Sequence, residues 1–376
     1  MFVEICTKIL SRIHKILCYC VLGLLPFVGI CQIPKDSIQT PKRFFRDKTI
    51  IPIPVVFRLP ETRWGAGAAI TSTFSFFRDS SWSKPSQLSF GITYTQNKQV
   101  LVFLPFNIFA NNNRYYFNGD TGWFRFNFYY YGIGEKQVSR EIYDVDFPRI
   151  RLLAAKAINK TTYLGLRYQY ESYRVTKTVE GGELASGQVA GSSFSRTSSL
   201  GISILKDTRD SVFYPRKGIF GEVYLLPTLR ILGADRNFTR LYADIAHYQL
   251  LSSKLVLATN YVGSVIMGKD IPFSQLSLLG GPRKMRGIYE GYFRDKNALL
   301  AQAELRWEVW KRLGLIGFGT VGFLGDEQTF LRLNKPKYTY GLGIRIATKK
   351  HLNIRLDYGA SPYDKGNFYA TIGEAF

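Results

Sequence analysis

The chain has 376 residues, a formal net charge of +22 and aromatic side chains at 15% of its positions. Its cysteines all lie within the first 31 positions, at Cys6, Cys18, Cys20 and Cys31. This distribution excludes a disulfide framework and a cysteine metal site from the rest of the chain.

The first 31 residues have the pattern of an export signal. Three basic side chains within 8–15 precede an uncharged apolar run over 16–30. The run is shorter than the roughly 20 apolar residues that a membrane-spanning helix needs, which favours the core of a signal peptide. We therefore predict that residues 1–31 are a signal peptide cleaved before Gln32, with lipidation of Cys31 as the alternative.

Residues 32–49 are interpreted as a short polar linker on the periplasmic side. The segment contains two prolines and several charged side chains. It is shorter than the roughly 50 residues of the smallest folded domains. We therefore expect no separate periplasmic domain in this segment, and we place the start of the main domain at residue 50.

From residue 50 onward, apolar and polar side chains alternate. In one such run the apolar residues are Leu88, Phe90, Ile92 and Tyr94. Runs of about ten residues with this period, bounded by turn residues, are typical of membrane β-barrels. We predict an all-β fold over 50–376, a transmembrane antiparallel barrel of sixteen strands, or of fourteen if the first and fourth are not strands. The predicted strands cover 50–59, 63–77, 86–95, 99–110, 114–130, 142–157, 161–176, 195–207, 218–229, 238–250, 254–267, 297–310, 313–325, 337–347, 351–359 and 366–376.

Alternation alone does not distinguish this barrel from a soluble sandwich. The export signal, the high aromatic content and the lengths of the connections favour the barrel, because outer-membrane barrels combine short periplasmic turns with long outer loops. The short turns are predicted at 159–160, 252–253, 311–312 and 348–350. The long loops are predicted at 131–141, 177–194, 326–336 and 360–365, and the longest connection, 268–296, falls on the same outer side.

This longest connection carries an ordered set of motifs: Gly280-Gly281, Arg286-Gly287 with Tyr289, Arg294-Asp295, and Ala303-Glu304-Leu305-Arg306. The set resembles the sixth extracellular loop and following strand of BamA/TamA-type outer-membrane barrels, the bacterial surface antigen superfamily. The resemblance implies that the loop folds back into the barrel lumen. It also implies that an acidic residue of the wall holds the Arg-Gly pair, and Glu304, which faces the lumen by alternation, is the candidate anchor.

Other segments resemble the same family. One is the turn between the eighth and ninth strands, another is the first hairpin at 60–67, and a third is the end of the chain, where Phe376 resembles the signal that barrel-assembly machinery reads. The family usually has an aspartate where this chain has Thr320, so one expected anchor of the loop arginine is missing. The residues that match the family's turn between the eighth and ninth strands are Asp207, Arg209, Asp210, Pro215 and Gly218.

The resemblance implies a role in assembling or translocating outer-membrane proteins. Because the linker is short, a periplasmic receiving protein or lipoprotein is expected to supply the substrate-receiving (POTRA) domains. A passive channel that favours anions is the first alternative. The second, an outer-membrane enzyme on a barrel scaffold, has little support, because the sequence shows no catalytic or metal-ligating pattern, and we expect no enzyme activity, metal or cofactor.

The basic charge has several interpretations. Nucleic acid is the usual partner of a basic soluble protein, but the export signal argues against it. For an outer-membrane protein we expect contacts with lipid, including lipopolysaccharide, or with an acidic solute in the lumen. Scattered loop charge without a specific anion site is equally consistent with the sequence.

Overall fold

The computed structural model describes residues 45–59, 63–76, 83–347 and 353–376. The predicted signal peptide with Cys31, most of the linker, positions 60–62 of the first hairpin and the predicted turn at 348–350 lie outside the described residues. The described part belongs to one compact unit, Phe44–Phe376.

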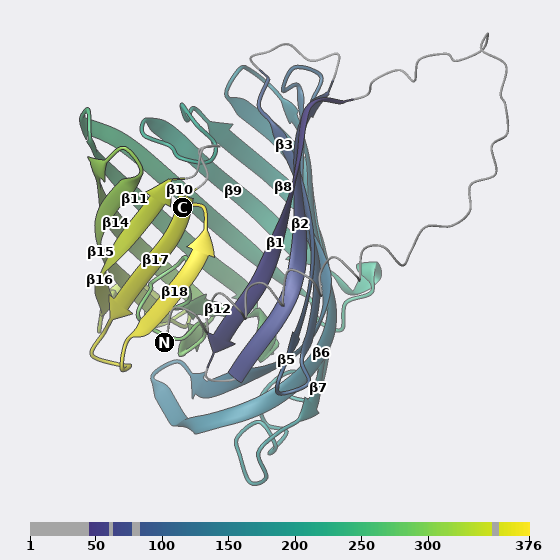
Figure 1. The fold of residues 1–376 in the computed structure, drawn as a ribbon. Coiled ribbons are helices and arrows are strands. Elements are labelled where there is room, and N and C mark those ends of the chain that lie inside the picture. Colours follow the sequence, from purple (N-terminus) through teal and green to yellow (C-terminus); the bar gives the residue numbers. More distant parts are fainter. Residues whose placement is uncertain (1–44, 60–62, 77–82, 348–352) are drawn as a thin grey trace, which may run out of the picture. The chain divides into compact units, whose positions relative to one another are not determined.

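This unit is a barrel built from a single sheet of sixteen antiparallel strands in chain order (Figure 1). The strands are β1 (Phe45–Leu59), β2 (Arg63–Phe76), β3 (Ser86–Thr95), β4 (Val100–Ala110), β5 (Tyr115–Ile133), β6 (Lys136–Ala157), β7 (Thr162–Lys177), β8 (Phe194–Asp207), β9 (Gly218–Thr228), β10 (Phe238–Ser252), β11 (Leu255–Gly268), β14 (Asn297–Trp310), β15 (Leu313–Gly325), β16 (Lys337–Ala347), β17 (Asn353–Ala360) and β18 (Asn367–Ile372). Within the described residues, no helix is long and apolar enough to cross a membrane.

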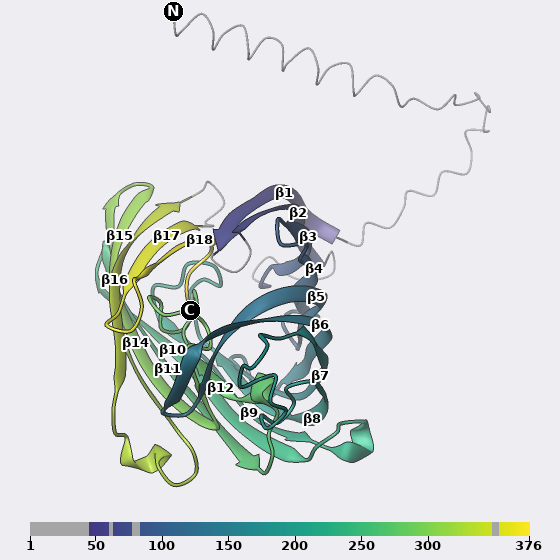
Figure 2. The same cartoon turned by 90° about the horizontal axis from the view of Figure 1, so that it is seen from below.

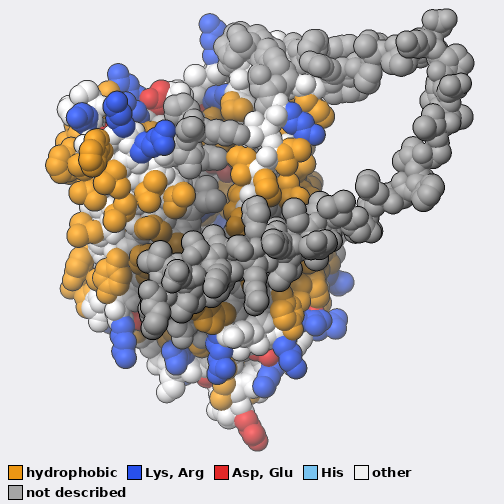
Figure 3. Space-filling model, viewed as in Figure 1, with side chains coloured by type: hydrophobic (Ala, Val, Ile, Leu, Met, Phe, Trp, Pro, Cys, Tyr) orange, Lys and Arg blue, Asp and Glu red, His pale blue; other side chains and the backbone are white. Residues whose placement is uncertain are grey.

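The alternation along each strand decides which side chains face outward. On β14, Leu305 and Trp307 are exposed, whereas Glu304 and Arg306 are buried. An apolar outer face with charged side chains inside is the alternation typical of membrane barrels. Figure 3 shows hydrophobic side chains over the middle of the visible wall and Lys and Arg side chains toward its two ends.

All sixteen predicted strands are present, with differences at their ends. Positions 45–49, predicted as linker, belong to β1 because they pair with the end of β2. The long loop predicted at 131–141 is wrong. There β5 and β6 continue as a hairpin around Gly134, and the pairing register shifts at an irregularity between Tyr130 and Gly132.

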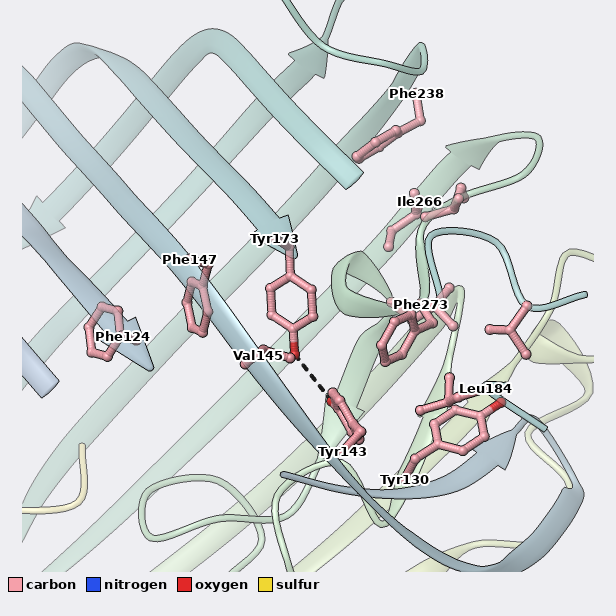
Figure 4. Packing of buried hydrophobic residues seen from close by; sticks show 13 residues of the cluster. Phe124, Tyr130, Tyr143, Val145, Phe147, Tyr173, Leu184, Phe238, Ile266 and Phe273 are labelled. Atoms are coloured by element: carbon pink, nitrogen blue, oxygen red, sulfur yellow. Dashed lines mark hydrogen bonds between the residues drawn. The ribbon is translucent and has the colours of Figure 1, made fainter. Parts of the chain in front are cut away.

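The connection after β11 folds into its own small structure. It contains η2 (Phe273–Gln275) and a two-stranded sheet of β12 (Ser277–Leu279) and β13 (Phe293–Asp295). Phe273 is fully buried among inward-facing side chains of the wall, including Tyr143 and Tyr173 (Figure 4). The hydroxyls of these two tyrosines are 3.2 Å apart. The connection is therefore packed against the inner wall of the barrel.

The two edge strands of the sheet, β1 and β18, lie on either side of an open seam (Figure 2). Among the described residues, no hydrogen-bond ladder joins them. The two edges are also unequal, because β1 has 15 residues and β18 has 6. The last strand was predicted to run to residue 376, but β18 ends at Ile372, since Gly373 adopts a φ of +86° that turns the chain out of the sheet.

Candidate functional site

The lumen loop, residues 269–296, turns back on itself before it reaches the wall. Backbone hydrogen bonds join Gly281 N to Ile288 O at 3.0 Å and Gly291 N to Leu279 O at 3.1 Å. Gly280 has a φ of +115°, and a Cβ there would lie 2.2 Å from the carbonyl oxygen of Tyr289. The predicted Gly280-Gly281 pair therefore forms the narrow neck of a loop that presents Arg286 at its tip.

Arg286 is fully buried and contacts two acidic residues on different strands. Its Nη1 donates to Asp357 Oδ2 on β17 at 2.5 Å, and its Nη2 donates to Glu304 Oε1 on β14. Its guanidinium also lies 3.7 Å from the centre of the Phe318 ring on β15. A planar guanidinium with several fixed donors suits such a divided contact better than a lysine would.

The two acids are held by further arginines. Glu304 accepts from Arg306 Nε at 2.7 Å, and Asp357 accepts from Arg345 Nη1 at 2.5 Å. Arg345 Nε also donates to Glu374 at 2.9 Å. We call this set the lumen charge network. It comprises Arg286, Glu304, Arg306, Arg345, Arg355, Asp357 and Glu374.

The network contains four arginines and three acids, and all seven side chains are almost completely inaccessible to solvent. Buried charges are tolerated only when they are paired and hydrogen-bonded. Removing one member therefore leaves other buried charges without full compensation. The network ties the loop to β14, β16, β17 and the end of the chain, which are all on one side of the seam.

Gly287 lets the loop backbone lie directly on β17. It has a φ of +107°, and a Cβ there would lie 2.8 Å from the backbone nitrogen of Ala360. A Cβ on Gly359 would in turn lie 2.6 Å from Gly287 N. The Gly287 N–H donates to the Tyr369 hydroxyl on β18 at 3.0 Å. Facing glycines thus allow the approach that brings Arg286 to its acids.

Tyr289 extends from the loop toward the opposite part of the wall. Its ring centre lies 5.4 Å from that of Tyr129, and its hydroxyl accepts from the Tyr129 N–H at 3.3 Å. Tyr131 contacts Tyr292 of the loop, with 4.6 Å between ring centres. The loop is therefore held between two walls, by charges on one side and by tyrosines on the other.

The tip of the β5–β6 hairpin extends over the same loop. Gly134 N donates to Arg294 O of the loop at 2.8 Å. Glu135 contacts Lys335 at 3.2 Å and Lys337 at 3.9 Å, on the far side of the barrel. We call residues 129–141 the strap.

Asp295 lies beneath the strap. Burial raises the pKa of the Asp295 carboxyl, although the carboxyl also accepts a hydrogen bond from the Lys296 N–H.

The turn motif assembles at the other end of the barrel. Asp207 is buried and contacts Arg209 Nε at 2.9 Å and Lys84 Nζ at 2.6 Å. Asp210 Oδ1 accepts backbone N–H bonds from Arg216 and Lys217. Gly218, after Pro215, has a φ of +102° and lies against the carbonyl of Thr208. These residues close the turn between β8 and β9.

Phe376 lies inside the barrel instead of continuing the last strand. Its ring packs beside Tyr248 and lies 5.3 Å from the Arg306 guanidinium. Glu374, which interrupts the alternation, explains the departure from the sheet, because it reaches Arg345 and accepts from Asn353 at 2.7 Å. The assembly-signal role of Phe376 stays a prediction.

Asp357 is the contact that sequence reasoning missed. The resemblance implied that one usual anchor is missing, because Thr320 stands where the family has an aspartate, and Asp357 on β17 supplies a second carboxylate. The outward side chains of Ile354 and Tyr358 already indicate that Asp357 faces the lumen. Within the described residues, no group of three potential metal-ligating side chains is present.

Three comparisons relate this geometry to known proteins. The family model described as the Omp85 superfamily domain matches residues 65–376. No curated protein matches the sequence. Among solved structures, BamA from Haemophilus ducreyi lacking POTRA domains 1–3 is similar, with a TM-score of 0.56, 12% identity, and coverage of 87% of this chain and 70% of that one.

Two CdiB structures are similar as well. The one from Acinetobacter baumannii has a TM-score of 0.53, 11% identity and coverage of 86% of this chain and 59% of its own. The one from Escherichia coli has a TM-score of 0.55, 9% identity and coverage of 86% and 61%. This chain thus spans about six tenths of the CdiB chains, and at these identities the likeness shows a common fold.

Proposed function

Because this chain belongs to the Omp85 superfamily, we propose that it is an outer-membrane barrel that assembles other proteins into the membrane or translocates them across it. The observation that carries the proposal is the combination of a loop fixed inside the lumen with an unpaired seam. A passive pore needs a clear axis and a closed wall, whereas here a loop is held across the lumen and, among the described residues, no ladder joins β1 to β18.

The loop inside the lumen argues against free passage of small anions. The lumen loop is fixed to the wall by the lumen charge network and by the tyrosines of the strap. The strap itself reaches Lys335 on the far side of the barrel. A solute that follows the axis would have to displace buried ion pairs, and the loss of one such partner costs about 3–5 kcal/mol.

The unpaired seam offers a sideways route. In lipid, every backbone donor and acceptor needs a partner, so an edge without a ladder is a place where another strand or a polypeptide gains by binding. In this proposal the lumen charge network stiffens the β14–β18 side, and the β1 edge moves relative to it. Arg286 and Glu304 act as positioning residues for this wall.

The proposal includes a partner with substrate-receiving domains on the periplasmic side. The CdiB chains extend beyond the region similar to this barrel, and in this proposal the partner supplies the parts that act beside the barrel. Affinity capture of the tagged chain from native envelopes tests this part. Recovery of a periplasmic protein or lipoprotein at fixed stoichiometry is expected, and a barrel recovered alone would contradict it.

The activity is tested in liposomes that contain the purified full chain. An unfolded eight-stranded outer-membrane protein is added, and its folding is followed by protease protection. Faster folding than in empty liposomes is expected, together with little conductance in planar bilayers. Steady anion-selective conductance without any effect on folding would instead identify a passive channel.

A further inference from the structure

Five prolines lie within the described strands of the sheet, and each one marks where a backbone donor is missing. Three of them are on interior strands: Pro105 on β4, Pro148 on β6 and Pro227 on β9. The other two, Pro52 and Pro54, are both on β1, the strand at the seam. A proline has no N–H, so it removes one ladder bond on the side to which its nitrogen points.

The three interior prolines show what a missing N–H does to the two hydrogen-bond ladders of a strand. The β3–β4 ladder skips from Leu88–Phe106 to Gly91–Phe103, and Pro105 lies in the gap. On its other side, the β4–β5 ladder continues through Pro105 without a break. Pro148 interrupts the β6–β7 ladder and Pro227 the β8–β9 ladder in the same way, each leaving its second ladder intact.

Pro52 and Pro54 interrupt nothing on the side that is paired. The β1–β2 ladder runs from Thr49–Thr73 to Leu59–Arg63 and includes both prolines. By the behaviour of the interior prolines, their nitrogens point away from β2, toward the free edge. Alternate residues of a strand point the same way, so two prolines two positions apart act on the same edge.

The free edge of β1 therefore lacks donors in its middle. Between the outward N–H groups of Ile50 and Val56, about 20 Å of strand offers only carbonyl acceptors. A strand that paired there would lose two ladder bonds. An unpaired edge would at the same time expose two fewer unsatisfied donors to lipid. Both effects favour the open edge over the closed one.

We propose that Pro52 and Pro54 block strand pairing at the seam, so that β1 does not form a complete ladder with β18 and the barrel stays unsealed at that edge. The short β18 and the inward turn at Gly373 act in the same direction, because they leave few residues to pair. This inference rests on the proposed sideways route, and it assigns the control of that route to two residues.

The test is a double variant, Pro52→Val with Pro54→Val, made in the full chain and reconstituted in phospholipid bilayers. Amide hydrogen exchange of peptides that cover 48–58 and 367–372 is followed by mass spectrometry. Valine restores the donors and suits a strand. We expect exchange of β18 amides to slow by about tenfold or more, because two hydrogen bonds become available at the seam.

The matched control is Pro105→Val. It should slow exchange around 88–91 and 103–106 and leave the seam peptides unchanged, because the nitrogen of residue 105 points toward β3. If the double variant assembles poorly, each single variant is measured in its place, with a smaller slowing expected.

Unchanged β18 exchange in an assembled double variant would overturn the inference. That result would leave the proposed assembly activity standing, because the exchange measurement uses no substrate. A failure of the proposed function appears separately, in the liposome folding assay of the unmodified chain.

Discussion

Arg286 and Asp357 are 71 positions apart in the sequence, and a 2.5 Å hydrogen bond joins their fully buried side chains. Arg286 belongs to the lumen loop and Asp357 to the wall strand β17, so the bond fixes a long connection to the barrel at one point. The facing glycines Gly287 and Gly359 make this approach sterically possible.

Replacing Arg286 by alanine is expected to destabilise the barrel by about 3 kcal/mol or more, because Glu304 and Asp357 then lose a buried cation. The loss should appear as a lower temperature of conversion to the slow-migrating form on semi-native gels. Arg283→Ala is the control, since this arginine lies in the same loop with an exposed side chain. Equal conversion temperatures for the two variants would contradict a stabilising contact at Arg286.

Replacing Gly287 by alanine tests the seating of the loop without removing a charge. The new Cβ would lie within 3 Å of the backbone at Ala360, so the loop must lift from β17. We expect a loss of heat resistance comparable to that of Arg286→Ala. Gly181→Ala separates steric from backbone effects. Gly181 also has a positive φ, +71°, but its Cβ would meet nothing within 4 Å, so about 1 kcal/mol is expected.

The strap is expected to limit conductance. The double variant Tyr131→Ala with Glu135→Ala removes the ring contact to Tyr292 and the ion pair with Lys335. Planar bilayer recordings should then show larger and more frequent openings than the unmodified chain. Asp235→Ala removes the exposed ion pair with Arg196 and the hydrogen bond from the Arg196 backbone N–H, both away from the strap, and should leave the recordings unchanged. A strap variant as quiet as this control would show that the lumen loop alone closes the barrel.

The period-two alternation was sufficient to predict all sixteen strands, because each wall strand presents one face to lipid and one to the lumen. The same alternation places Glu304 in the lumen. It does not predict that Arg286 also reaches Asp357, because that contact depends on how the loop is seated on a strand far along the chain. The strap was missed because polar residues near Glu135 are typical of a loop, whereas the tyrosines before them support a hairpin.

The pH dependence of stability should contain a contribution from Asp295. Burial raises the pKa of this carboxyl in the folded protein, so the folded state binds the proton more tightly than the unfolded state, whose pKa is about 3.9. The folded protein therefore loses stability as the pH rises from the pKa of the unfolded state through the higher pKa of the folded state. Asp295→Asn should be more stable than the unmodified chain at neutral pH and similar to it below about pH 4. Melting temperatures of both proteins at the two pH values check the sign.

The last residue provides a test of two different roles. If Phe376 is read by barrel-assembly machinery, its deletion should reduce the amount of assembled protein in the membrane, as measured by heat-modifiable mobility of envelope fractions. If Phe376 only packs beside Tyr248 and Arg306, the protein should assemble in normal amount and convert at a lower temperature. Glu374→Gln is the matched control, because it weakens the contact to Arg345 and keeps the terminal aromatic ring. A normal amount of assembled protein after deletion of Phe376 would reject the assembly-signal role, whatever the conversion temperature.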